Sequence, residues 1–157
     1  MLMHRIAVAV CTTALVGAFG AATAAAQGTT DSMGGKMSKM AGMKGGTYMA
    51  TLTSPSGGSV AGMGKVDGTT ASVMISGDKS GSTRPWHIHI GSCGNDKGIF
   101  GSPSAYKPIS VGSDGKGKST ATLSMPLPDS GSYFVNVHSS SSDMKTIVAC
   151  GPLTKGM

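Results

Sequence analysis

From Thr47 onward the chain consists of short runs in which apolar and polar residues alternate, separated by turns rich in glycine. Representative runs are TYMATLTS, TTASVMIS and SYFVNVH, and representative turns are SPSGG, GDKSG and GSDGKG. Successive side chains of a β-strand point to opposite faces, so these runs predict strands and the turns predict hairpin connections. No helical period is sustained in this part. Roughly seven or eight strands, spaced about ten residues apart, predict an all-β barrel or sandwich.

The N-terminal residues 1–26 have the pattern of a secretory signal peptide. Arg5 precedes an uncharged apolar run from Ile6 to about Ala22, and three alanines form a cleavage site before Gln27. We therefore expect a mature chain that begins near Gln27 and is periplasmic or secreted. A retained membrane anchor is the alternative. The run is rich in glycine and alanine and has no basic cluster after it, so no membrane span is expected after cleavage.

Export decides how the cysteines are interpreted. Cys11 lies in the apolar run and leaves with the signal peptide, so Cys93 and Cys150 remain. Two cysteines in an oxidising compartment predict one disulfide bond. Closing a loop of about 60 residues is worth about 4 kcal/mol, which is a large share of the stability of a small domain.

Residues 27–46 differ from the rest of the mature chain in composition. The segment QGTTDSMGGKMSKMAGMKGG is rich in Gly, Ser and Lys and is expected to be disordered by itself. Its large apolar residues are all methionines: Met33, Met37, Met40 and Met43. Their spacing allows a weakly amphipathic helix or a plain tail. Thioether sulfur also favours Cu(I), so the alternative is a set of accessory Cu(I) ligands.

The histidines of the mature chain fall in two predicted strands. In RPWHIHI, His87 and His89 alternate with the residues expected to face the core, which are Trp86, Ile88 and Ile90. In SYFVNVH, His138 lies on the face opposite the apolar residues, which are Tyr133, Val135 and Val137. All three histidines are therefore expected on faces that point away from the core.

Two imidazoles at i and i+2, with a third from a neighbouring strand, predict a three-nitrogen site for copper or zinc. The alternative is three surface histidines without a role. A nucleophilic triad of His138 with Ser139–Ser142 and Asp143 is not favoured, because no strand-turn-helix elbow surrounds the serines. A blue-copper site is excluded by the context of the two cysteines, and covalent haem by the absence of a C-x-x-C-H motif.

Charge gives little further guidance about partners. The net charge is +6, and lysines spread through turns carry most of the positive charge. Arg5 and Arg84 are the only arginines, and neither belongs to a basic cluster with aromatic residues, so nucleic-acid binding is not expected.

Several segments, in their order along the chain, resemble the copper/zinc superoxide dismutase superfamily. They are GTYMATLTSPSGGSVAGMGKV, PWHIHIGSC, PISVGSDGKGKSTATLSM, YFVNVH and IVACGPL. The resemblance covers residues 47–157. It implies an eight-stranded Greek-key β-barrel, an immunoglobulin-like sandwich in the wider sense, with a Cys93–Cys150 disulfide. It also implies one copper ion held by His87, His89 and His138.

The sequence departs from this family in three places. Residues 91–108, which we expect to form one long irregular surface loop, contain none of the bridging and zinc-binding histidines that the family has there, and their only acidic residue is Asp96. Neither zinc nor a fourth copper ligand is therefore expected. Ile147 replaces the arginine that guides superoxide in the family, and Lys145 is the nearest positive charge. The chain also lacks glutamate, so no glutamate is available to orient a ligand from outside the metal shell.

These features predict an exported copper-binding protein without a zinc site that acts in copper handling or in superoxide defence under oxidative stress. An active copper-only dismutase is one alternative. A metal-free extracellular interaction module is another. The methionine segment favours copper handling, in which a partner protein would deliver or receive the ion.

Overall fold

The computed structural model describes residues 45–156, which form ten strands and one short 3-10 helix, η1. The strands are β1 (Thr47–Leu52), β2 (Ala61–Asp67), β3 (Thr70–Ser76), β4 (Thr83–Arg84), β5 (Trp86–Ser92), β6 (Asn95–Ile99), β7 (Ile109–Val111), β8 (Gly117–Thr122), β9 (Tyr133–His138) and β10 (Ile147–Lys155). The helix η1 spans Pro103–Ala105. The predicted all-β class is confirmed for this part of the chain.

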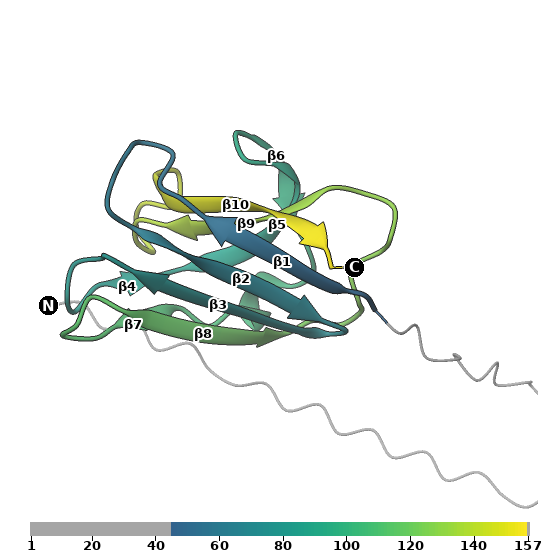
Figure 1. Cartoon of the computed structure of the whole chain (residues 1–157), viewed down its shortest axis with the longest axis horizontal. Helices are drawn as coiled ribbons and strands as arrows, with labels where there is room; N and C mark the ends of the chain where they lie inside the picture. The colour runs from purple at the N-terminus through teal and green to yellow at the C-terminus, as the bar shows by residue number, and fades with distance from the viewer. Residues whose placement is uncertain (1–44, 157) are drawn as a thin grey trace, which may run out of the picture. The chain divides into compact units, whose positions relative to one another are not determined.

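All ten strands belong to one antiparallel sheet in the order β4-β7-β8-β3-β2-β1-β10-β9-β5-β6. Strands β4 and β5 lie near opposite ends of this order, yet only Pro85 separates them along the chain. The sheet therefore curls until its two ends approach each other, and Figure 1 shows β9, β10 and β5 above β3 and β8. The concave side of this curled sheet encloses the core.

The core follows from the alternation of side chains along the strands. Inward residues of β1 and β3, such as Leu52 and Val73, are buried, while their neighbours in sequence are more exposed. Trp86 and Ile88 of β5 join the same core, and so do the three apolar residues predicted for β9, which are Tyr133, Val135 and Val137. The core-face prediction is confirmed for all of these residues.

Ile90 is an exception, because its side chain is 39% exposed. Strand β5 changes register against β6 between His89 and Gly91. Beyond that irregularity the strand leaves the core and enters the β5–β6 hairpin, so Ile90 no longer has a covered face to point into. The prediction that Ile90 faces the core is therefore wrong.

Residues 91–108 were expected to form one irregular surface loop, and this is wrong in part. The segment contains β6, which pairs with β5 as a hairpin, and η1. Gly94 permits the turn of this hairpin, since its φ value is 84°. The strand count therefore rises to ten, which also includes two short strands, β4 and β7, at one edge of the sheet.

A disulfide joins Cys93 at the end of the β5 hairpin to Cys150 in β10, with a Cα–Cα distance of 6.1 Å. The predicted bond is confirmed. It links positions 57 residues apart and ties the β5–β6 hairpin to β10. Among the residues that the structure describes, none belongs to a helix long and apolar enough to span a membrane.

Candidate metal centre

Neighbouring strands β5 and β9 bring the three histidines together. Strand β5 pairs with β9 so that His87 lies opposite Asn136 and His89 lies opposite Phe134. The backbone N–H of His138 donates to the carbonyl of Pro85 at 2.8 Å, which extends this pairing by one step. As a result, one ring nitrogen from each histidine lies within 4.8 Å of the other two. The predicted cluster is present in the structure.

The hydrogen bonds on the far sides of two rings decide which nitrogens have free lone pairs. Nδ1 of His138 lies 2.7 Å from the carbonyl oxygen of Met144, which only accepts, so Nδ1 carries the proton. Nδ1 of His89 lies 2.9 Å from Oδ1 of Asp96, so it donates in the same way. In the neutral form of each ring, Nε2 then carries the free lone pair and is available to bind a cation.

The third nitrogen of the cluster belongs to His87. Its Nδ1 lies 3.2 Å from Nε2 of His138, and since the latter has no proton, His87 donates in the metal-free protein. A cation between the rings would take the place of that proton and shift His87 to its other tautomer. The ligand set would then be Nδ1 of His87 and Nε2 of both His89 and His138.

Nε2 of His89 is the atom that most directly favours a bound cation here. It is buried and is the one buried side-chain polar atom without a hydrogen-bond partner among the described residues. A buried acceptor without a partner costs free energy, and such atoms are rare in folded proteins. A metal ion held by the three nitrogens would satisfy this atom, and imidazole nitrogen suits copper, zinc and other transition metals.

The three histidines lie outside the hydrophobic core cluster, as expected, but they are not exposed to solvent. Their relative exposures are only 4–6%, because Phe134 of β9 and Tyr106, which lies outside the two strands, cover this side as well. The ring of Tyr106 lies 5.3 Å from that of His87, and Phe134, which is fully buried, lies 5.4 Å from His89. Alternation predicts on which side of each strand the histidines lie, but it does not predict which residues cover that side.

Burial also sets the protonation of the cluster. It lowers the pKa of His87 to about 4, with smaller contributions from the nearby His138 and His89. Burial likewise lowers the pKa of His138. Both rings are therefore neutral at pH 7, which is the form that binds a metal ion.

Asp96 is a residue of the candidate site that the sequence interpretation missed. It lies in β6, and pairing of β6 with β5 places its carboxylate against His89. Burial opposes ionisation of Asp96, but the N–H of Gly98 and the His89 ring outweigh it and lower the pKa of the carboxyl group. The carboxylate therefore fixes the ring orientation of His89, a role for which only glutamate was considered.

The cluster lies beside a surface depression of about 510 Å³. Its lining includes His138, Asp96, Asn136, Lys145 and Ile147. A small ligand that enters the depression therefore reaches the edge of the histidine cluster, with the Lys145 ammonium as a nearby positive charge.

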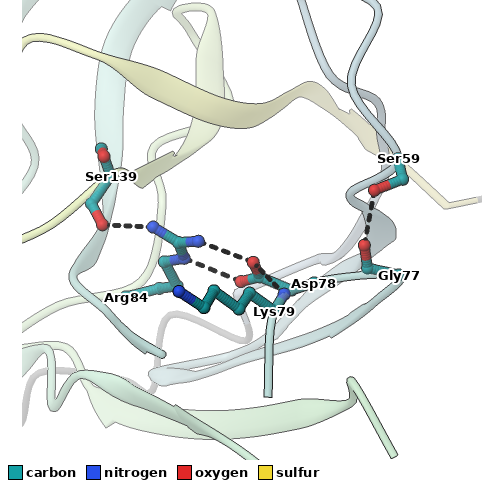
Figure 2. A network of polar contacts seen from close by, with 6 residues as sticks. All are labelled: Ser59, Gly77, Asp78, Lys79, Arg84 and Ser139. Carbon is teal, nitrogen blue, oxygen red and sulfur yellow. Dashed lines mark hydrogen bonds and ion pairs between the residues drawn. The ribbon is translucent and has the colours of Figure 1, made fainter. Parts of the chain in front are cut away.

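A second polar network fixes the ends of the ligand-bearing strands (Figure 2). The Arg84 guanidinium donates to both carboxylate oxygens of Asp78, at 2.7 and 2.6 Å, and its Nη1 donates to the carbonyl of Ser139. The Asp78 side chain is only 2% exposed, and the Arg84 hydrogen bond lowers its pKa. Arg84 precedes Pro85 and β5, while Ser139 follows His138. The network therefore holds the start of one ligand strand against the end of the other.

The serines after His138 form a turn of their own. Asp143 and Ser140 bond to each other through backbone and side chain, and Thr146 donates to Asp143. The His138 ring bonds to Met144 and His87 instead. This arrangement matches the interpretation of the serines as a turn rather than as part of a triad.

The signal-peptide prediction for residues 1–26 and the accessory ligands Met33, Met37, Met40 and Met43 lie outside the described residues. No protein-family model matches the sequence, and no curated protein matches it.

Proposed function

We propose that the chain is an exported copper-binding protein, a zinc-less relative of the copper/zinc superoxide dismutases, that holds one copper ion through His87, His89 and His138. The observation that carries the proposal is the buried, unpartnered Nε2 of His89, which converges with one nitrogen from each of the other two rings. Without a cation, Nε2 of His89 would remain a buried acceptor without a hydrogen-bond partner. This argues against the alternative of a metal-free interaction module.

Copper is favoured over zinc for two reasons. Nitrogen sites of a given geometry bind Cu(II) more tightly than Zn(II). In addition, the order of the histidine and cysteine motifs matches the copper side of the superfamily, while residues 91–108 lack the histidines of its zinc side. The curled antiparallel sheet and the disulfide are compatible with a Greek-key barrel of that superfamily. The disulfide also supports export to an oxidising compartment.

Copper handling is the activity that we favour. Asp96 fixes the ring of His89 and Met144 fixes that of His138, so the three histidines form a preorganised site beside an open depression through which a partner protein reaches the ion. Bound copper would supply one-electron redox chemistry.

The second candidate, superoxide dismutation, is favoured by Lys145, whose ammonium at the depression attracts a small anion. The position of Ile147 weakens it, because isoleucine neither attracts nor binds an anion.

The test uses the full chain with its disulfide intact, loaded with one equivalent of Cu(II) and no zinc, beside its His87→Ala variant. Copper affinity is measured by competition with a chelator, and superoxide dismutation is measured on the same samples. Circular dichroism checks that the variant is folded. We expect tight binding of one Cu(II) that the variant loses, with turnover no greater than that of free copper.

Each other outcome has a defined meaning. Turnover far above free copper that disappears in the variant would make the protein a zinc-free dismutase. Equal copper affinity in both proteins, or tighter binding of Zn(II) than of Cu(II), would overturn the proposed site.

A further inference from the structure

The methionines of the described residues avoid the core. None of the five, which are Met49, Met63, Met74, Met125 and Met144, belongs to the buried core. Methionine is a flexible apolar residue that commonly fills gaps in protein interiors. Here Met63 and Met74 are 50% and 56% exposed, on strands whose other face supplies ordinary core residues. Their exposure therefore calls for a reason other than packing.

Three of these methionines lie on one face of three adjacent strands, β1, β2 and β3, which run side by side in Figure 1. Met63 of β2 lies directly opposite Met74 of β3. Met49 of β1 lies opposite Lys65, two residues beyond Met63, and is therefore the diagonal neighbour of Met63 on the same face. Directly opposite residues have Cβ atoms about 5 Å apart, and diagonal neighbours about 7–8 Å, which long side chains span.

The surroundings leave room for a small cation. Met63 and Met74 line a hollow of about 480 Å³, together with the small residues Gly62 and Gly117. Met49 lies outside this lining, so its thioether would approach the cation from the neighbouring strand β1. The Lys65 ammonium pairs with Asp67 at 3.2 Å, so it turns along β2 away from Met63. Lys118 lies opposite Met74, and Asp114 lines the same hollow with a compensating charge.

We propose that the thioethers of Met49, Met63 and Met74 form a second metal site, specific for soft monovalent cations such as Cu(I) and Ag(I). Three neutral sulfur ligands select Cu(I) over Zn(II) and Cu(II), which prefer nitrogen or harder donors. This site lies on β1–β3, whereas the histidine cluster lies on β5 and β9, so the two bind independently. The proposal does not depend on the function assigned to the histidines.

The test is a titration of the full chain, labelled with ¹³C at the methionine methyl groups, with silver nitrate in chloride-free buffer. Ag(I) serves as a probe for Cu(I) that does not change oxidation state. NMR reports each methionine separately, so binding to residues 27–46 or to the histidines does not interfere. We expect the methyl signals of Met49, Met63 and Met74 to shift together along one binding curve. In Met63→Leu, the remaining two should respond at least tenfold more weakly.

Met125 provides a matched control, since it is 54% exposed and lies outside β1–β3. Met125→Leu should leave the three curves unchanged, and the Met125 signal should respond only at higher silver concentrations. Three unrelated curves, or curves that coincide with that of Met125, would show that these methionines bind silver only as separate surface thioethers and would overturn the proposal.

Discussion

Oδ1 of Asp96 lies 2.9 Å from Nδ1 of His89, on the side of the ring opposite the unpartnered Nε2. One hydrogen bond therefore fixes both the tautomer and the orientation of a candidate metal ligand. Carboxylates in this position also raise the basicity of the ligating nitrogen. Asp96 is the part of the site whose contribution is most easily separated from that of the ligands themselves.

Replacing Asp96 with alanine should lower the affinity for Cu(II) by about 10- to 100-fold, which is the usual effect of losing such a partner. The His89 ring then becomes free to rotate or to carry its proton on Nε2. Competition with a chelator measures the affinity. Asp67→Ala is the matched control, because Asp67 is an exposed β2 residue that pairs only with Lys65. Equal affinities in the two variants would remove the role assigned to Asp96.

Sequence alternation predicted the two faces of β5 and β9 well. Trp86 and Val137 face the core, and the three histidines gather on the other side. Alternation describes a strand and its two sides, however, and not what covers each side. The burial of His87 therefore could not be predicted, because its cover includes Tyr106, far along the chain.

The position of Asp96 required pairing information that no single strand carries. A signal was nevertheless present, since Gly94 soon after the apolar run of β5 marks a turn, and the turn brings Asp96 back alongside β5. Because residues 91–108 contain no histidine, nothing in their sequence indicated that site residues lie there. Ile90 was misassigned because a register change interrupts the alternation that otherwise defines β5.

The Arg84–Asp78 pair gives a second prediction. Replacing Arg84 with glutamine removes the charged partner of Asp78, whose carboxylate keeps only the N–H of Lys79. For this partly buried pair the loss should cost about 1–3 kcal/mol. Chemical denaturation measures the free energy of unfolding. Because Arg84 also holds Ser139, the residue after His138, the variant should in addition bind Cu(II) more weakly than the wild type.

The exposed pair Lys155–Asp129 is the control for this change. Its side chains are 51% and 74% exposed, so Lys155→Gln should cost less than about 1 kcal/mol and leave copper affinity unchanged. Similar losses of stability in the two variants would mean that the Arg84 network contributes no more than a surface ion pair.

The disulfide gives a third prediction. The double replacement Cys93→Ala/Cys150→Ala should lower the free energy of unfolding by about 4 kcal/mol, because a closed loop of this length restricts the unfolded chain. Denaturation of the oxidised wild type and the variant measures the difference. Wild type treated with a reductant should match the variant, and a reduced protein as stable as the oxidised one would contradict the expected contribution.

The histidine cluster predicts how the stability of the copper-free protein depends on pH. The pKa of His87 is about 4 when folded and about 6.5 when unfolded, so between these values the unfolded state binds more protons. The contribution of the neutral His87 ring to the free energy of unfolding is therefore fully present above pH 6.5 and is lost as the pH is lowered towards 4. From pH 7 to 4.5, His87 alone should cost about 2 kcal/mol. The lowered pKa of His138 acts in the same direction.

Denaturation of the metal-free protein at a series of pH values from 7 to 4.5 measures this loss. Above pH 4.5 the carboxyl groups of Asp78 and Asp96, whose pKa values are lowered, stay ionised and add little to the slope. His87→Asn removes the titrating ring but keeps a polar side chain, so its stability should change less with pH than that of the wild type. If the free energy of unfolding changed equally with pH in the two proteins, the folded chain would not hold His87 in its neutral form. His87 would then not be prepared to bind a metal ion at neutral pH.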